Sequence, residues 1–144
     1  MLTTETVERW LDEDVGHRDV TNQVPGRTTG RLVATEPGVV AGLDAAVAVF
    51  EYLGVDAEPS ADVGASVEPG ETVLDATGDA RDVLRGERVA VNVVGHAAGV
   101  ATQTRRAVRT AREVSESVRV AATRKTTPGL RGVEKRAVAA GGGD

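Results

Sequence analysis

Three consecutive side chains near the end of the chain could hold an anion. Thr123, Arg124 and Lys125 follow directly after a short β-like run at 118–122. The guanidinium of arginine is a planar fork of donors that matches a carboxylate or a phosphate, and the ammonium of lysine adds a compact positive charge. A Pro-Gly pair at 128–129 allows the backbone to turn close to a ligand. This pattern fits an anion site at the carboxyl end of a strand, and it fits equally a solvated loop that carries two charges.

The distribution of charge favours the anion site. Residues 1–100 carry 7 basic and 18 acidic side chains, a net charge of −11, whereas residues 101–144 carry 10 basic and 4 acidic ones, a net charge of +6. Such asymmetry indicates that the C-terminal third faces an anion, either a small molecule, a nucleic acid or the acidic part of the same chain. Nucleic acid is disfavoured because the whole chain has a net charge of −5 and the basic third lacks aromatic side chains that could stack on bases.

For the other candidate side chains, the sequence pattern favours structural roles over functional ones. Arg105, Arg109 and Arg112 share one face of a predicted helix, where a solvated or ion-paired surface is the expected arrangement. The histidines, His17 and His96, lie far apart and neither has a neighbour at metal-ligand spacing. Because His96 stands among small residues on a predicted packed helix, we expect a hydrogen-bonded structural histidine there. No metal ligand is predicted in this chain.

The composition fits a globular protein with an aliphatic core. Of the 144 residues, 40% are hydrophobic, 27% are charged and 2% are aromatic, which leaves valine, alanine and leucine to fill the interior. The absence of cysteine favours a reducing, cytoplasmic setting. No stretch approaches the roughly 20 apolar residues that cross a bilayer, so we expect no membrane association.

The elements that must position these side chains follow from apolar spacing and turn residues. The sequence predicts helices over 4–14, 43–53, 80–116 and 130–140, strands over 30–35, 38–41 and 118–122, strand and turn over 56–78, and a loop over 16–26. The third helix is expected to be interrupted at Gly86, Gly95 and Gly99. The order is α+β, and its final helix–strand–helix is how one unit of an α/β barrel begins.

Four stretches together resemble a known family. In order and spacing they are similar to quinolinate phosphoribosyltransferases, the carboxylating nicotinate-nucleotide pyrophosphorylases, and they read GHRDVTNQVPG, EPGVVAGL, ERVAVNVVGHAAGVAT and TRKTTPGLRGVEKRAVAAGGG. The resemblance runs from about residue 10 to the last residue. It implies an N-terminal α/β sandwich domain over 1–91, followed over 92–144 by the first helix–strand–helix of an incomplete α/β barrel.

The resemblance also implies a reaction and roles for individual residues. Enzymes of this family are pentosyltransferases that join quinolinate to phosphoribosyl pyrophosphate with Mg²⁺, and they release nicotinate mononucleotide, CO₂ and pyrophosphate in NAD biosynthesis. By resemblance, Thr123 and Arg124 bind the substrate, and Lys125 is a catalytic and substrate-binding residue on the phosphoribosyl pyrophosphate side. Arg88 is implied to reach the partner's site in a homodimer. The Mg²⁺ ligands are expected in a part of the family's sequence that this chain does not contain.

The chain departs from the family at its end. In the family the glycine run leads into Asn-His-Arg, whereas this chain ends at Asp144, one residue before that triplet is expected. A later lysine and the acidic residues that handle ribose and metal are not in this sequence either. We therefore expect these 144 residues to be an incomplete form that is inactive alone. Two alternatives stay open: a ModD-like pyrophosphorylase paralogue, and a non-catalytic association domain.

Overall fold

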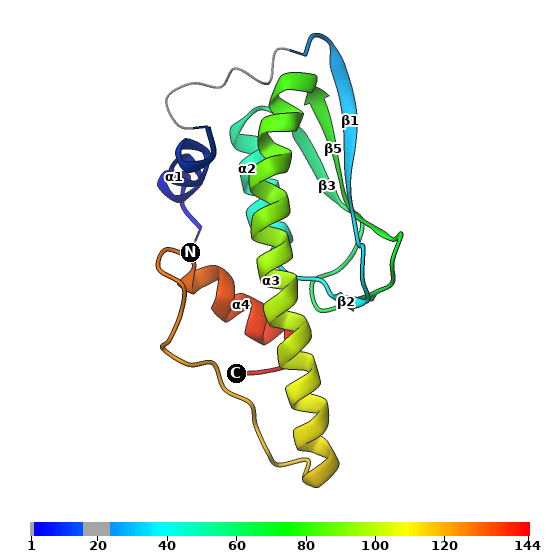
Figure 1. Cartoon of the computed structure of the whole chain (residues 1–144), viewed down its shortest axis with the longest axis vertical. Coiled ribbons are helices and arrows are strands. Elements are labelled where there is room, and N and C mark those ends of the chain that lie inside the picture. The colour runs from blue at the N-terminus through cyan, green and yellow to red at the C-terminus, as the bar shows by residue number, and fades with distance from the viewer. Residues whose placement is uncertain (1, 16–23) are drawn as a thin grey trace.

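A small sheet and a long helix organise the molecule. The computed structural model describes residues 2–15 and 24–144, so the predicted loop at 16–26 lies mostly outside the described residues and His17 lies wholly outside them. The elements are α1 (Thr4–Val15), β1 (Arg27–Val33), β2 (Gly38–Val39), α2 (Leu43–Tyr52), β3 (Asp56–Pro59), β4 (Ser66–Val67), β5 (Thr72–Asp79), α3 (Ala80–Val114) and α4 (Arg131–Gly141). Figure 1 shows α3 running the length of the molecule, with the strands on one side and α1 and α4 on the other.

The main sheet is antiparallel and covered on one face. Its strand order is β1-β5-β3, and β2 and β4 form a separate antiparallel pair. In the register of β1 and β5, Leu32 lies opposite Leu74. Leu74 and Ala76 are buried under the helices, whereas the hydroxyl of Thr77 meets that of Thr29 at 2.9 Å on the exposed face. This alternation of buried and exposed side chains is typical of an antiparallel sheet with one wet face.

Helices α2 and α3 fill the covered face of the sheet. Phe50 of α2 is 1% exposed and shares one apolar cluster with Leu74 of β5 and Val83 of α3. A Cβ atom at Gly86 would lie 2.6 Å from the Phe50 ring. The absence of a side chain at Gly86 therefore lets α3 pass close to α2.

Helix α3 is continuous, so the predicted interruptions at three glycines are wrong. It has 35 residues, which corresponds to about 50 Å. Each glycine costs about 1 kcal/mol relative to alanine in a helix, and burial of α3 along most of its length offsets that cost. The predicted domain division at residue 91 falls within this helix and stays a prediction. None of the described helices, α3 included, is long and apolar enough to span a membrane.

Helix α4 packs against the C-terminal half of α3. Val133 and Ala137 of α4 belong to the same buried cluster as Ala97 and Ala101 of α3. A Cβ atom at Gly141 would lie 2.5 Å from the Ala101 carbonyl oxygen. Small residues on both helices thus allow a close approach.

The segment between α3 and α4 contains no strand, so the predicted strand at 118–122 is wrong. Its backbone nevertheless makes two hydrogen bonds with the last residue: Asp144 N–H donates to the Val120 carbonyl at 2.8 Å, and Ala122 N–H donates to the Asp144 carbonyl at 2.6 Å. This alternation is the pattern of a parallel β-pair. Contact with a single residue is too short to form a ladder. The predicted α+β class is confirmed, with helix and loop in place of the last helix–strand–helix.

Candidate anion-binding site

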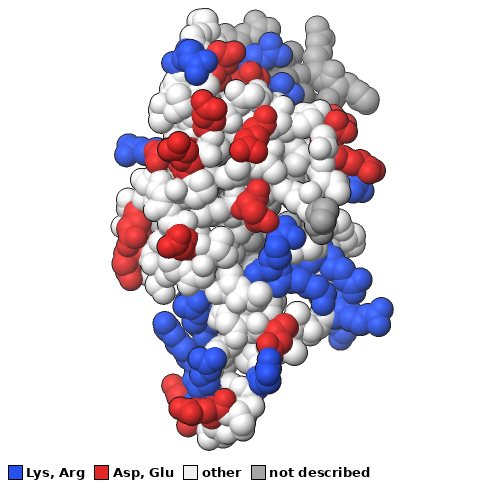
Figure 2. Space-filling model, turned by 180° about the vertical axis from the view of Figure 1, so that it is seen from behind, with Lys and Arg blue, Asp and Glu red and all other residues white. Residues whose placement is uncertain are grey.

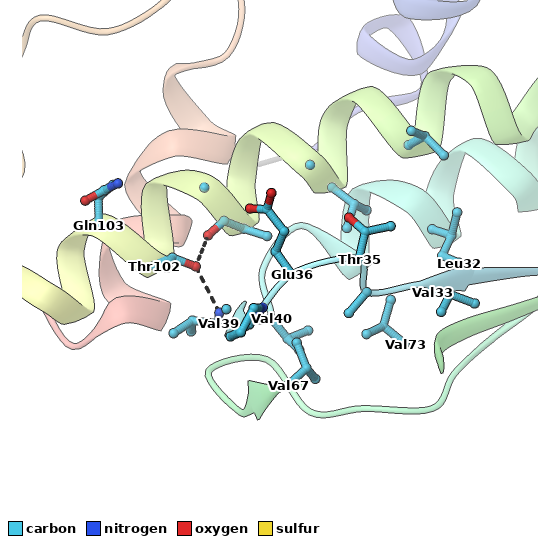
Figure 3. A pocket seen from close by; sticks show the side chains of 18 of the residues that line it. Leu32, Val33, Thr35, Glu36, Val39, Val40, Val67, Val73, Thr102 and Gln103 are labelled. Carbon is cyan, nitrogen blue, oxygen red and sulfur yellow. Dashed lines mark hydrogen bonds between the residues drawn. The ribbon is translucent and has the colours of Figure 1, made fainter. Parts of the chain in front are cut away.

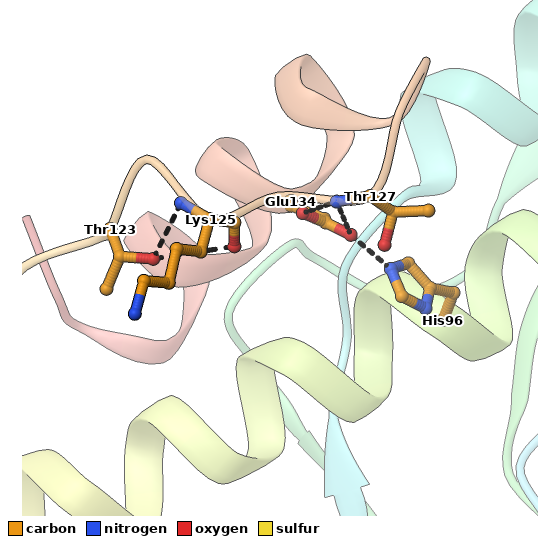
Figure 4. Close-up of polar contacts among 5 residues, drawn as sticks. All are labelled: His96, Thr123, Lys125, Thr127 and Glu134. Carbon is orange, nitrogen blue, oxygen red and sulfur yellow. Dashed lines mark hydrogen bonds and ion pairs between the residues drawn. The ribbon is translucent and has the colours of Figure 1, made fainter.

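The predicted anion-binding residues lie on a loop that leads into α4. Within this loop, which we define as residues 123–129, the Lys125 N–H donates to the Thr123 hydroxyl oxygen at 3.1 Å and forms a tight local turn (Figure 4). Gly129 has φ of 82°, a left-handed conformation that residues with a Cβ rarely adopt. The Pro-Gly pair therefore turns the chain into α4, as its sequence predicts.

Two of the three predicted residues line a cavity. Thr123, Arg124 and Lys125 are all exposed. Thr123 and Lys125 line a concavity of about 340 Å³ between the loop, α3 and α4, together with Lys135 of α4. Arg124 does not line this concavity. The structure thus brings two ammonium groups, the Glu134 carboxylate and the side chains of three threonines (Thr104, Thr123 and Thr126) to a shared hollow, and it places Arg124 on the exposed loop beside it.

The carboxylate of Glu134, which the sequence analysis did not single out, contacts both the loop and α3. Glu134, in the first turn of α4, accepts a hydrogen bond from Thr127 N–H, with Oε2 at 3.1 Å and Oε1 at 3.3 Å. Its Oε1 also lies 2.8 Å from Nε2 of His96 on α3 (Figure 4). The hydrogen bond from Thr127 lowers the pKa of Glu134, His96 lowers it further, and burial opposes both effects.

His96 is hydrogen-bonded, as predicted, but it is not enclosed. Its side chain is 39% exposed, whereas that of Glu134 is 12% exposed. The predicted role as a structural histidine therefore fits its contact with Glu134, and the expectation that it packs among small residues does not fit its exposure. The signal for Glu134 was present in the stretch GLRGVEK, since an acidic residue in the first turn of a helix is favourably placed.

Arg88 lies apart from this loop. Its Nε and Nη2 both donate to Oδ2 of Asp14 on α1, each at 2.9 Å. Arg88 precedes His96 by about two turns of α3, which corresponds to about 12 Å along the helix. Within one chain, the structure therefore does not bring Arg88 to the cavity that Thr123 and Lys125 line.

The predicted arginine face on α3 is only partly solvated. Arg109 and Arg112 are exposed, as expected. Arg105 is half-buried and donates to three carbonyl oxygens, at 2.9 Å to Gly141, 3.0 Å to Ala140 and 2.9 Å to Gly64. The prediction of a solvated or ion-paired side chain is therefore wrong for Arg105, because the C-terminal carbonyls of α4 need donors that the helix does not supply.

A second hollow has a different character. A groove of about 670 Å³ runs between α3 and the β1–β2 region, and its walls are largely aliphatic (Figure 3). Its uncharged polar side chains are Thr35, Thr102 and Gln103, and Thr102 is already hydrogen-bonded: Oγ1 accepts from Val39 N–H at 2.9 Å and donates to the Ala98 carbonyl at 2.6 Å. The charged side chains along it are of both signs, namely Arg31, Glu36, Glu87 and Arg106. The groove is therefore a poor match for a dianion.

The surface charge follows the same division as the sequence. Seen from behind in Figure 2, acidic side chains predominate over the upper part of the molecule and basic side chains over the lower part. Among residues 2–15 and 24–144, no group of three or more histidine, cysteine, aspartate or glutamate side chains could hold a metal ion.

Comparisons with known proteins agree with the resemblance of the sequence. Residues 17–98 match the family model for the quinolinate phosphoribosyl transferase N-terminal domain, and residues 100–144 match the model for the C-terminal domain of that family. A probable carboxylating nicotinate-nucleotide pyrophosphorylase of Methanothermobacter thermautotrophicus is 39% identical over 142 residues, which cover 96% of this chain and 51% of the relative. The Mycobacterium leprae nicotinate-nucleotide pyrophosphorylase is 40% identical over 148 residues, with the same coverage of 96% and 51%.

A solved structure gives the same picture. The crystal structure of NadC from Streptococcus pyogenes superposes with a TM-score of 0.90 at 34% identity, and the match covers 99% of this chain and 54% of that one. The chain spans about half the length of the curated relatives it matches.

Proposed function

The chain belongs to the quinolinate phosphoribosyl transferase family, and from this premise we propose that its loop 123–129 binds quinolinate and phosphoribosyl pyrophosphate. The reaction we propose for the complete protein transfers the phosphoribosyl group to quinolinate with loss of CO₂, giving nicotinate mononucleotide. The observation that carries the proposal is that Thr123, Lys125 and Lys135 line one hollow in the basic third of the chain, where two ammonium groups outnumber the single carboxylate of Glu134.

Quinolinate is a planar dianion, which matches the donors of this loop. In the proposal, Arg124 holds one carboxylate through two parallel hydrogen bonds, and Thr123 donates a third. Lys125 supplies a compact positive charge for the phosphoribosyl pyrophosphate side. These groups bind and orient both anions, so their contribution to the rate is positional and electrostatic.

The bond changes follow from the substrates. The pyridine nitrogen of quinolinate forms a bond to the anomeric carbon of ribose, and the bond from that carbon to pyrophosphate breaks. The ring nitrogen is then cationic and stabilises the electron pair left when the adjacent carboxylate departs as CO₂, after which the ring carbon takes up a proton. Mg²⁺ would neutralise charge on pyrophosphate, and among the described residues no group of three or more histidine, cysteine, aspartate or glutamate side chains could hold it.

A homodimer is part of the proposal. Arg88 is proposed to reach the site of a second copy, where it would add a further guanidinium to the anion-binding groups. In the single chain the Arg88 side chain, which extends from α3, is 33% exposed and contacts Asp14 of α1. Dimer formation would therefore either replace this contact or use it to aim the guanidinium outward.

Calorimetric titration of quinolinate into the purified chain tests the proposed site. We expect one molecule to bind per chain, and Arg124→Ala to weaken binding at least tenfold, because a charge-assisted bidentate pair contributes more than the roughly 1.4 kcal/mol that a factor of ten requires. Arg109→Ala is the matched control, since it removes an exposed guanidinium from α3 and should leave the affinity unchanged. Equal affinity in the wild type and Arg124→Ala would contradict the proposal.

A second assay addresses turnover. With quinolinate, phosphoribosyl pyrophosphate and Mg²⁺ supplied, we expect the 144-residue chain alone to form no nicotinate mononucleotide above the uncatalysed rate. Robust turnover by this chain would contradict that expectation and would show that the described residues suffice for the chemistry.

A further inference from the structure

We infer that Glu134, in contact with His96, is a positioning residue that sets the backbone conformation of loop 123–129 and so aims its cations. The inference rests on the proposed function, since it concerns how the same loop is held. It assigns a role to two residues that the predicted substrate-binding set does not include.

The first step is the geometry of the contact. The carboxylate of Glu134 accepts from the Thr127 backbone N–H at 3.1 Å and lies 2.8 Å from Nε2 of His96. One side chain of α4 thereby joins the loop to α3 (Figure 4). Because α3 and α4 are themselves packed through buried alanines, the attachment point is rigid.

The second step is burial. The Glu134 side chain is 12% exposed, in contrast to the exposed ion pair of Arg119 and Asp144, whose side chains are 76% and 48% exposed. A surface pair of that kind contributes little, because water competes for both groups. The Glu134 side chain is more covered than either of these, although it also lines the hollow, and removal of its carboxylate would leave the Thr127 N–H without its acceptor.

The third step is the distance to the cations along the chain. Thr127 is only two residues after Lys125, and the Lys125 N–H is itself held by the Thr123 hydroxyl at 3.1 Å. On the other side, the Leu130 N–H donates to the Thr127 carbonyl at 3.0 Å. The backbone on both sides of Lys125 is therefore fixed, and a shift of about 1 Å in such a group can cost a large factor in binding or rate.

The charge state fits this role. The hydrogen bond from Thr127 lowers the pKa of Glu134, so the carboxylate is ionised at neutral pH and can accept from both partners. Its place in the first turn of α4 is also favourable for a negative charge. Lys125 and Lys135 line the same cavity as Glu134 and add positive charge there.

The test compares three variants of the 144-residue chain by NMR and calorimetry. The probe is quinolinate, and the backbone readout is the hydrogen-exchange rate of the Thr127 amide. In Glu134→Ala we expect this rate to rise about tenfold or more and the quinolinate affinity to fall about tenfold. Glu134→Gln should be intermediate in both, because its carboxamide oxygen can still accept from Thr127 but is uncharged and therefore a weaker acceptor than the carboxylate. Glu113→Ala, which removes an exposed carboxylate from α3, should change neither.

The outcomes separate this inference from the proposed function. Unchanged exchange at Thr127 in a folded Glu134→Ala variant overturns the inference, and so does faster exchange with unchanged quinolinate affinity. If Glu134→Ala does not fold, the same two criteria apply to Glu134→Gln. If the wild-type chain binds no quinolinate, both the proposed function and the positioning role are contradicted. If the wild-type chain binds quinolinate and the Glu134 variants bind it equally well, only the positioning role is contradicted.

Discussion

The sheet region and the C-terminal region of this chain are held together in different ways. In the sheet region, the side chains that join α2, β5 and α3 are almost fully buried, and Phe50 and Leu74 are 1% and 0% exposed. In the region after α3, the structure has no strand and the candidate functional residues are exposed. Besides the buried Val133 and Ala137 of α4, polar side chains such as Arg105 and Glu134 hold this region in place. The larger apolar side chains of the core therefore lie in the first region, and the proposed anion site lies in the second.

Phe50→Ala should have the largest effect, because it tests whether the second region depends on the first. Deletion of a buried phenylalanine leaves a cavity and costs about 3–5 kcal/mol. Since α3 passes through both regions, we expect the whole fold to unfold cooperatively. Every probe should report a single unfolding transition whose midpoint lies at a lower urea concentration than in the wild type. A variant in which loop 123–129 and α4 stay ordered while the sheet unfolds would show that the two regions are independent.

Arg105→Ala should loosen the second region without affecting the first. The variant leaves three carbonyl acceptors without their charged donor, and a hydrogen bond to a charged group contributes about 1.5–3 kcal/mol. Amide exchange should accelerate in α4 and in the segment before it, while the amides of β5 keep their protection. Arg105→Lys should recover only part of the effect, because one ammonium cannot reproduce the arginine fork. Uniform acceleration across the sheet would contradict a local role for Arg105.

Acid should release the loop before it unfolds the core. The pKa of Glu134 is lowered from its ordinary value of 4.5 in the folded chain, first by the Thr127 hydrogen bond and then by His96. The stabilising contribution is therefore fully present above about pH 4.5 and is lost as the pH falls through the lowered value. The groups that contact this carboxylate are His96 and the Thr127 N–H, and Lys125 and Lys135 line the same cavity as Glu134. Thr127 exchange, corrected for the intrinsic effect of pH, should rise in that window, and Glu134→Gln should remove the dependence.

Arg109→Ala should have the smallest effect. Arg109 is exposed on the same helix as Arg105, and a substitution on an exposed surface usually changes the free energy of unfolding by less than about 0.5 kcal/mol. Urea unfolding of the two alanine variants side by side measures how much of the Arg105 effect comes from its carbonyl contacts. A loss for Arg109→Ala as large as that for Arg105→Ala would contradict the contrast between them.

The sequence predicted the first region from its periodicity and the second from its motif. Helices α1 and α2 lie close to the predicted 4–14 and 43–53 because their apolar spacing and end signals agree. The glycines of α3 misled the prediction, since local propensity takes no account of the tertiary packing that a long helix gains. The strand expected at 118–122 is absent because a strand needs a neighbour along its length, which local pattern does not report.

The sequence predicted where the candidate site lies, but it did not predict the side-chain contacts that hold the site in place. The stretch TRKTTPGLR drew attention to Thr123, Arg124 and Lys125, and the family resemblance, now confirmed, gave them proposed roles that stay predictions. The contacts of Glu134 with His96 and of Arg105 with the end of α4 join residues more than 30 positions apart. Such pairings follow from how α3 and α4 pack, and neither the spacing nor the residue types of the sequence encode them directly.

Chemical-shift mapping with quinolinate gives the most direct measurement of where the anion binds. Titration of the ¹⁵N-labelled chain should shift the backbone amides of residues 123–127 together with that of Lys135, while the amides that line the groove of Figure 3, such as Val39 and Thr102, stay in place. Saturable shifts confined to the loop and Lys135 are the predicted result. Shifts confined to the groove, or no shifts at any quinolinate concentration, would contradict an anion site at loop 123–129.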